Sequence, residues 1–151
     1  AGAQSLMVFD TWGGMLSTSA YKEFSLQYMA RIVAQVKASH PDTPIVLFTK
    51  GGGAWLEDMA NTGCDGLGLD WTVDIAQAKS RVGSQVALQG NMDPVLMSTT
   101  AEAVRSGARQ VLSDFGDGGG HVFNLGHGIQ PNAKPENMTA LVDAVRGFAR
   151  S

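Results

Sequence analysis

Five short runs of apolar residues recur along the chain, and a polar, glycine-rich turn follows each of them. The runs are almost wholly apolar and do not alternate with polar residues, which is typical of parallel strands that are covered on both faces. Each run is short enough for a strand and is bounded by turn residues. The sequence therefore predicts β-strands over residues 6–9, 44–48, 66–69, 86–88 and 121–125.

Between the first two runs, apolar residues recur at helical spacing. We expect this helix to start at a cap among Ser17–Ser19 and to end near His40, because a residue that precedes proline disfavours the helical conformation. Its predicted inner stripe is Phe24, Tyr28, Ile32 and Val36, widened by Met29 and Val33.

Four more helices are predicted, one after each remaining strand. A short one carries Trp55, Leu56 and Met59, and another runs from Ile75 to near Gly83. Thr99–Glu102 has the spacing of a capping box before a longer helix, and Pro135 suits the first turn of the last one. The predicted inner faces of these two are Val104, Ala108, Val111, Leu112 and Phe115, and then Met138, Leu141, Val142, Val145 and Phe148. The pattern is five consecutive βα units in one domain over residues 1–151.

Composition narrows the class of protein. The 151 residues are 44% hydrophobic and 17% charged, as in soluble globular proteins, and the net charge of −3 does not favour nucleic acid as a partner. We see no apolar run long enough for a membrane and no export signal. Cys64 is the only cysteine, which indicates a reducing cytoplasm and a small buried residue after a helix, although a reactive thiol is the alternative. The chain starts at Ala1 almost directly before a strand, so we expect a piece of a longer chain.

Polar residues follow every predicted strand. In a parallel α/β sheet the ligand site lies beyond the carboxyl ends of the strands, so we expect these side chains to converge on one cavity. They are Asp10 and Thr11, then Lys50, then Asp70, then Gln89, Asn91 and Asp93, and finally Asn124 and His127.

Each of these residues also has an ordinary structural interpretation. Asp70 with Thr72 can cap a helix, Asp93 and Thr11 can serve a turn, and Lys50 can be a solvated side chain. The glycines at 51–53 could present backbone N–H groups to an anion. His40 and His121 are expected to be ordinary residues at a helix end and a strand start. His127 is the residue that we favour as functional, because Gly126 and Gly128 let its backbone bend tightly or approach a ligand.

Several kinds of site are disfavoured. No two histidines stand at i, i+4, and no cysteine pairs with a histidine at zinc-ligand spacing, so we expect no metal site. The Walker pattern, the dinucleotide fingerprint and the Gly-x-Ser-x-Gly elbow are all absent.

Five motifs, taken in chain order, resemble one enzyme family. They are similar to segments of the C-terminal half of the uroporphyrinogen decarboxylase family of haem biosynthesis, and the resemblance covers essentially the whole chain, including Phe148. Five motifs in order are much more specific than any one alone. The motifs are Phe9–Gly14 (FDTWGG), Phe48–Gly52 (FTKGG), Gly68–Thr72 (GLDWT), Leu88–Pro94 (LQGNMDP) and Asn124–Ile129 (NLGHGI).

The resemblance implies a fold and a reaction. The fold is α/β, a (β/α)8 TIM barrel of which these five units are the last, and such a partial barrel is expected to be inactive alone. The reaction implied is decarboxylation of the four acetate side chains of uroporphyrinogen III to give coproporphyrinogen III. It implies no metal and no organic cofactor, a small-molecule porphyrinogen substrate, a cytoplasmic enzyme and a homodimer.

The resemblance also implies residue roles. Thr11 matches a hydroxyl residue that contacts substrate, His127 matches a substrate-contacting histidine that bonds or pairs with a carboxylate, and Phe9 lines the cleft. The family's central aspartate, its carboxylate-binding arginines and an active-site tyrosine belong to the other half. We therefore assign no catalytic residue here, and Asp10 and Asp70 are not taken as substitutes.

Two other functions are kept as alternatives. One is a zinc-dependent corrinoid methyltransferase of the same superfamily, which needs a histidine and cysteine metal set. The other is a non-catalytic barrel fragment or interaction module, which would not need Thr11 or His127.

Overall fold

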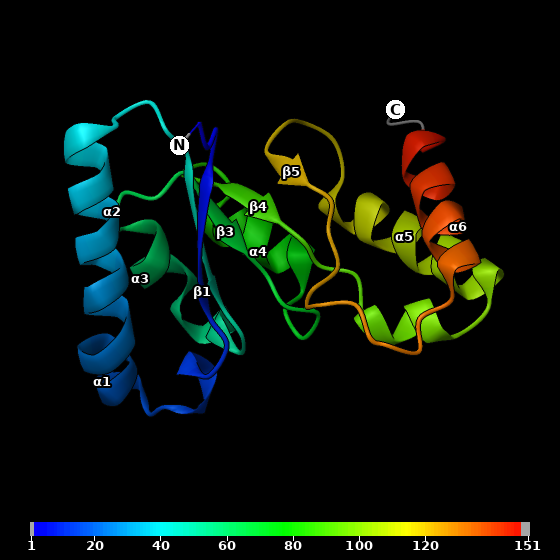
Figure 1. Ribbon diagram of the computed structural model, residues 1–151, viewed down its shortest axis with the longest axis horizontal. Helices are drawn as coiled ribbons and strands as arrows, with labels where there is room; N and C mark the ends of the chain where they lie inside the picture. The colour runs from blue at the N-terminus through cyan, green and yellow to red at the C-terminus, as the bar shows by residue number, and fades with distance from the viewer. Residues whose placement is uncertain (1, 149–151) are drawn as a thin grey trace.

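A computed structural model describes residues 2–148, and its centre is a five-stranded parallel sheet (Figure 1). The strands stand side by side in chain order, which confirms the predicted succession of βα units. Their bounds are β1 Leu6–Asp10, β2 Ile45–Thr49, β3 Gly66–Gly68, β4 Ala87–Gln89 and β5 His121–Val122.

The prediction of a strand over residues 121–125 is correct only for its first two residues. Beyond Val122, the one further pairing is an isolated bridge between Leu125 and Met92. The physical reason lies in the neighbouring strand, because Gly90 has a φ of 140° and turns the chain out of the extended conformation after β4. The regular ladder therefore ends, and the segment that carries His127 continues as a loop.

Helices connect the strands as expected. Ser17, Asp74 and Thr100 accept hydrogen bonds from backbone N–H groups of the first turns of the helices that follow them, so the cap of the long helix is Thr100 and not Thr99. The helices are α1 Thr18–Tyr21, a π-helical segment Lys22–Leu26, α2 Gln27–Ser39, α3 Leu56–Ala60, α4 Ile75–Val82, α5 Ala101–Phe115 and α6 Pro135–Arg146; short 3-10 turns occupy Gly13–Met15, Gly52–Trp55 and Pro94–Ser98.

The predicted inner stripe of the first helix is wrong for three of its residues, while its fourth member, Val36, packs against the core. Phe24, Tyr28 and Ile32 are exposed, whereas Tyr21, together with Met29 and Val33 from the widening pair, lies in the core. The π-helical segment is the reason, because a π turn holds one more residue than an α turn and so rotates the following residues around the helix axis. Tyr21 and Met29 thereby share a face.

The inner face of α6 also differs from the prediction, while that of α5 is confirmed. Met138 and Val142 are exposed on α6, and the residues that α6 buries are Asn137, Ala140, Leu141 and Ala144. The side chain of Asn137 donates hydrogen bonds to the carbonyls of Met97 (3.0 Å) and Thr99 (3.1 Å), which fixes the rotation of the helix. On α5, Val104, Ala108, Leu112 and Phe115 are buried, and Val111 packs against them.

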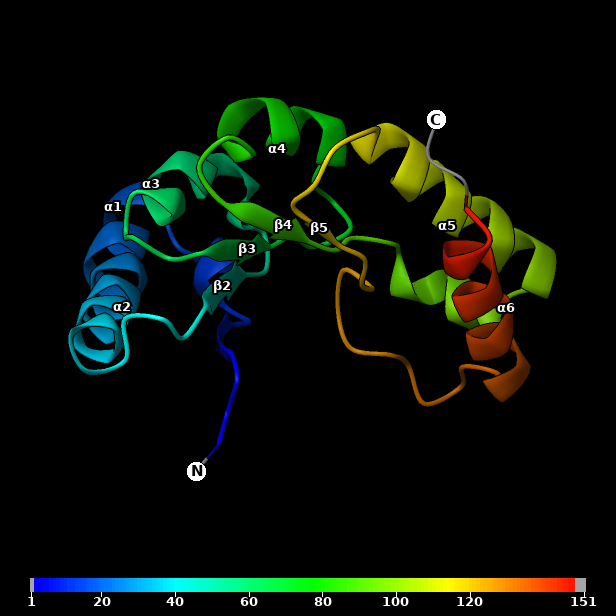
Figure 2. The same cartoon turned by 90° about the horizontal axis from the view of Figure 1, so that it is seen from above.

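The sheet is curved, and the helices lie along its outer side (Figure 2). Within residues 2–148 the inner face has no helix over it, as the resemblance to a (β/α)8 barrel implies. Sequential parallel strands with helices on the outer side form a segment of a (β/α)8 barrel. Among the described helices, none is both long and apolar enough to cross a bilayer.

Candidate functional site

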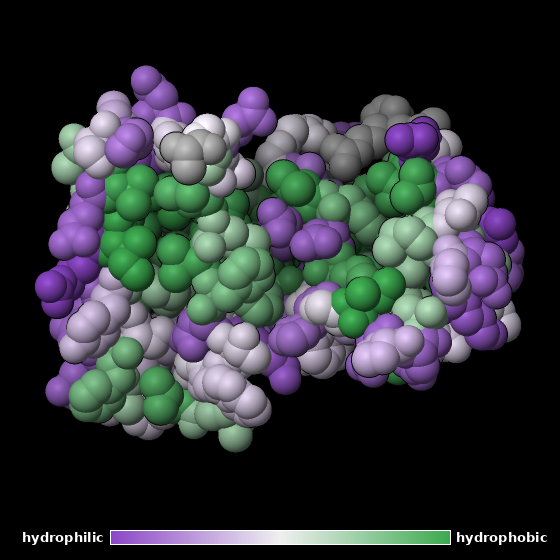
Figure 3. All heavy atoms as spheres, in the orientation of Figure 1, coloured by the Kyte–Doolittle hydropathy of each residue, from purple (hydrophilic) through white to green (hydrophobic). Residues whose placement is uncertain are grey.

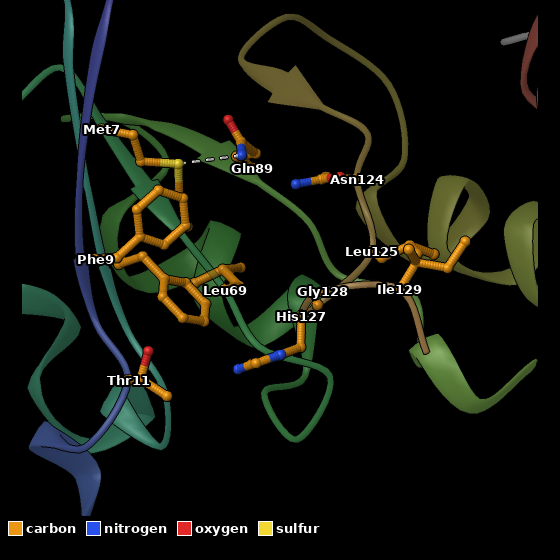
Figure 4. A pocket seen from close by; sticks show the side chains of 13 residues that line it. Met7, Phe9, Thr11, Leu69, Gln89, Asn124, Leu125, His127, Gly128 and Ile129 are labelled. Atoms are coloured by element: carbon orange, nitrogen blue, oxygen red, sulfur yellow. Dashed lines mark hydrogen bonds between the residues drawn. The ribbon is translucent and has the colours of Figure 1, made fainter. Parts of the chain in front are cut away.

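A cavity of about 420 Å³ lies on the inner face of the sheet, beside the carboxyl ends of the strands. Figure 4 shows Thr11 and His127 toward one end of it, Met7 and Gln89 toward the other, and Phe9 and Leu69 between them. The full lining is Met7, Phe9, Thr11, Phe48, Gly68, Leu69, Gln89, Asn124, Leu125, Gly126, His127, Gly128 and Ile129.

The pairing register of the strands builds one wall of this cavity. Phe9 pairs with Phe48, Phe48 with Gly68, and Gly68 with Gln89, so these four residues form one row across the sheet. The row turns to the inner face, since all four line the cavity. At Gly68 an added Cβ would lie 2.9 Å from Met7 Cε and 3.0 Å from Phe48 Cδ2, so a side chain at this position would press on both residues in the wall of the cavity.

Thr11 reaches the cavity because of the alternation along β1. Met7, Phe9 and Thr11 lie on the inner side, and Asp10 between them points the other way. The Asp10 carboxylate accepts hydrogen bonds from the backbone N–H groups of Trp12 (3.3 Å) and Gly13 (2.8 Å) and from the Ser25 hydroxyl. Asp10 thus ties the turn after β1 to the first helix and stabilises the position of Thr11.

His127 is exposed in the cavity and lies between two aromatic rings. Its ring centroid is 6.3 Å from that of Phe48 and 6.0 Å from that of Trp71, and the interplanar angle to Trp71 is 89°. Figure 4 shows its imidazole pointing into the cavity, toward the side where Thr11 lies. The structure therefore brings together the three predicted site residues Phe9, Thr11 and His127, which come from the first and the last of the five units.

Two carboxamides in the cavity were not among the predicted site residues. Gln89 lies at the end of β4, where its Nε2 is 3.6 Å from Met7 Sδ, and Asn124 projects from the loop after β5. Both were recognised as polar residues at strand ends. The signal that selects Gln89 is the sheet register, which places it in the same inward-facing row as Phe9.

The expectation that all strand-end side chains converge on one cavity is wrong for five of them, namely Asp10, Lys50, Asp70, Asn91 and Asp93. Asp93 is the cap of the Pro94–Ser98 turn and accepts a hydrogen bond from the Val95 N–H, as its turn interpretation predicts. Lys50 places Nζ 5.5 Å from the centroid of the Trp71 ring and is neither a cavity residue nor fully solvated.

Asp70 is a buried tie between loops. It is 1% exposed, and its carboxylate accepts hydrogen bonds from the backbone N–H of Gly51 and from both the N–H (2.7 Å) and the hydroxyl of Thr72. The Gly51 N–H of the glycine turn after β2, which could have bound an external anion, therefore binds the Asp70 carboxylate instead. The cap of α4 is Asp74, so the expected capping role of Asp70 and Thr72 is wrong in detail.

Cys64 stands apart from the cavity. It is 6% exposed, its Sγ lies 3.5 Å from the Met59 carbonyl oxygen, and burial raises the pKa of its thiol. It is thus the small buried residue after a helix that the sequence indicates. Within residues 2–148, no three histidine, cysteine, aspartate or glutamate side chains are grouped closely enough to hold a metal ion.

Hydrophobic side chains gather on the face of the molecule that carries β1 (Figure 3). Phe9, Trp12 and Phe24 are 67%, 73% and 64% exposed, which is unusual for large aromatic residues. They belong to a shallow apolar groove between the turn after β1 and the first helix.

Comparison with known proteins gives one consistent result. The family model described as "Uroporphyrinogen decarboxylase (URO-D)" matches residues 1–148. A curated protein of Thioalkalivibrio sulfidiphilus named uroporphyrinogen decarboxylase is 63% identical over 147 residues, which are 96% of this chain and 42% of that relative. Relatives of the same name from Nitrosococcus oceani and Legionella pneumophila (strain Lens) are 59% and 56% identical, over 96% of this chain and 41% of each relative. The chain thus spans about two fifths of the length of these relatives.

Proposed function

We propose that this chain, which belongs to the uroporphyrinogen decarboxylase family, forms part of an enzyme that decarboxylates the four acetate side chains of uroporphyrinogen III to give coproporphyrinogen III. The observation that carries the proposal is the meeting of Phe9, Thr11 and His127 in one cavity from opposite ends of the chain. The names of the relatives agree with this activity.

The reaction asks for positioning and electrostatics. When an acetate loses CO2, the electron pair of the broken C–C bond flows into the pyrrole, which accepts it after protonation at a ring carbon. The exocyclic carbon then takes up a proton and becomes a methyl group, and the ring carbon releases the proton it had gained, so that the aromatic pyrrole is restored. The substrate supplies its own electron sink, so the proposal includes no metal and no organic cofactor. The protein must orient the ring and hold the carboxylates.

The cavity offers groups for these tasks. In the proposal, the Thr11 hydroxyl and the His127 imidazole bind substrate carboxylates, and the Phe9 ring packs against an apolar part of the macrocycle. The acid that protonates the ring is proposed to lie in the remaining part of the enzyme, as the family resemblance implies. We also propose that the enzyme is a cytoplasmic homodimer.

A chimera tests the proposal. In the Thioalkalivibrio sulfidiphilus relative, this chain replaces the aligned segment of 147 residues, and the product is called the chimera below. We expect it to convert uroporphyrinogen III to coproporphyrinogen III, as judged by chromatography of the oxidised porphyrins, with the unmodified relative as control. A chimera that unfolds cooperatively but does not decarboxylate would contradict the proposal. A chimera that does not fold would show that this chain cannot replace the aligned segment of the relative.

The 151-residue chain by itself is expected to show no decarboxylation in the same assay. Its sheet holds five strands in an open order, whereas closing a barrel of this kind takes about eight. Activity of the chain equal to that of the chimera would show that this cavity alone suffices.

The zinc-dependent methyltransferase has no support from the described residues. Cys64, the one thiol it could use, is buried and faces the Met59 carbonyl instead of the cavity. Metal analysis of the active chimera separates the two functions, because stoichiometric zinc that is needed for activity would favour the methyltransferase class. Turnover of porphyrinogen by the chimera would exclude the non-catalytic alternative.

A further inference from the structure

We propose that Trp71 is the positioning residue that orients the imidazole of His127 into the cavity, and that it does so from a turn held rigid by the buried Asp70 carboxylate. This inference deepens the proposed function and rests on it. Trp71 does not line the cavity, so it acts through His127 and not by touching substrate.

The contacts of His127 are the first step. Within residues 2–148, its imidazole makes no hydrogen bond, and the groups that define its orientation are the rings of Trp71 and Phe48. The interplanar angle of 89° to Trp71 at 6.0 Å is the edge-to-face geometry that aromatic pairs favour. Phe48 belongs to the sheet, whereas Trp71 belongs to the turn after β3, so the imidazole is held from two elements.

The turn that carries Trp71 is tied on both sides. The Asp70 carboxylate binds the Gly51 N–H of the loop after β2, and the Asn91 side chain donates to the backbone carbonyls of Asp70 (2.8 Å) and Val73 (2.6 Å). Asp70 and Asn91 are 1% and 6% exposed, so water does not compete strongly for these hydrogen bonds. Lys50 adds a cation at 5.5 Å from the centroid of the Trp71 ring.

The backbone before His127 lies directly on this turn. An added Cβ at Gly126 would come within 2.3 Å of the Trp71 backbone nitrogen, and the Gly126 N–H donates to the Met92 carbonyl at 2.8 Å. Gly126 is therefore a point of close approach between two loops. With both the backbone and the ring of Trp71 against it, the His127 segment has little freedom to swing away from the cavity.

The test is a double-mutant cycle in the chimera, with the variants Trp71→Leu, His127→Ala and the pair together. Leucine keeps apolar bulk without the ring. We expect Trp71→Leu to lower kcat/KM about tenfold, mainly through KM, and Trp71→Phe to restore it to within about twofold of the parent. In the His127→Ala background, Trp71→Leu should cause no further loss, because the residue through which Trp71 acts is gone.

Two measurements separate this inference from the proposed function and from plain destabilisation. NMR of chimera labelled at the histidine Cε1 reports the ring of His127, whose signal should shift in Trp71→Leu and return toward the parent value in Trp71→Phe, whether or not the chimera decarboxylates. Trp12→Ala is the matched control, because Trp12 is 73% exposed, follows Thr11 directly and does not line this cavity.

Additive losses in the double mutant, or an unchanged His127 signal in Trp71→Leu, would overturn the inference. An equal effect of Trp12→Ala on KM would also overturn it. A parent chimera without activity would instead contradict the proposed function. The NMR measurement would then still show whether Trp71 orients the His127 ring.

Discussion

At the scale of the residue, chemical type alone does not decide which polar side chains face the cavity. Thr11 and Asp10 are neighbours after the same strand, yet one lines the cavity and the other accepts hydrogen bonds from the Gly13 N–H and the Ser25 hydroxyl. A carboxylate at a strand end can satisfy nearby backbone donors, and this competes with a functional role. The family resemblance favoured Thr11 over Asp10, and the alternation of side chains along the strand gives the physical reason why only Thr11 lines the cavity.

Removal of the polar groups at the Thr11 end of the cavity should weaken substrate binding. We expect His127→Ala and Thr11→Val each to lower kcat/KM of the chimera by about 10- to 100-fold, since a hydrogen bond to a charged group contributes about 1.5–3 kcal/mol. Steady-state kinetics give the loss, and thermal unfolding shows whether the fold is intact. Thr139→Val, at an exposed position of α6, is the control for the threonine change. Kinetics that do not change in His127→Ala would remove that residue from the site.

At the scale of the element, hydrophobic periodicity predicted the presence and order of helices and strands but not always the rotation of a helix. The regular spacing of Phe24, Tyr28 and Ile32 resembles an inner face, yet the π-helical segment turns these residues outward. On α6 the rotation is set by a polar residue, Asn137, whose hydrogen bonds to carbonyls near the Pro94–Ser98 turn no apolar pattern reports. By contrast, α5 has a regular helix and a wide apolar face, and its prediction is confirmed.

Tyr21 links α1 to the end of β2, and its contribution to the stability of the fold depends on pH. It is fully buried, its hydroxyl is 3.0 Å from Thr49 Oγ1, and its ring stacks on Trp55 at 3.9 Å. Burial raises the pKa of Tyr21 to about 12, while an unfolded tyrosine titrates near 10. Between these two values the unfolded chain loses the proton first, so the contribution of Tyr21 to stability is full below pH 10 and declines as the pH rises toward 12.

We expect Tyr21→Phe to lower the free energy of unfolding of the chimera by about 1–3 kcal/mol near neutral pH, because it leaves the buried Thr49 hydroxyl without this partner. The difference between the parent and the variant should shrink from pH 9 to pH 11, as measured by urea unfolding at each pH. Tyr28→Phe, at an exposed position of α2, is the control. A constant difference over this range would contradict the raised pKa.

At the scale of the whole molecule, the succession of βα units followed from the apolar pattern, whereas the outer placement of the helices and the curvature that makes an inner face were expected only through the resemblance to a barrel family. A run of apolar residues does not tell which side chains face helices and which face the interior of a barrel. The motifs supplied that information for Phe9 and Thr11 through their resemblance to a family, whereas His127 was favoured already for its place between Gly126 and Gly128 at a strand end. Gln89 was expected in the cavity only as one of many strand-end side chains, and Phe48 was not expected there; the register across the strands is what places both on the inner face.

The proposed homodimer is a property of the complete enzyme and is testable in the chimera. We expect sedimentation velocity to give twice the mass of one subunit at micromolar concentration, because the family resemblance implies a dimer. The apolar residue Val95, which is 51% exposed and does not line the cavity, is a candidate for burial in the assembled enzyme. A monomer that retains full decarboxylase activity would show that association is not needed for the site.

The glycine in the cavity wall has a consequence for how such a site can evolve. Since a methyl group at position 68 would collide with Met7 and Phe48, the room for a large ligand is specified by the absence of one side chain. The groups proposed to recognise the substrate, Thr11 and His127, are specified elsewhere in the cavity. If the proposed function holds, the space for the ligand and the groups that bind it are encoded at separate positions. A lineage could then change the size of its ligand by filling position 68 while Thr11 and His127 stay as they are.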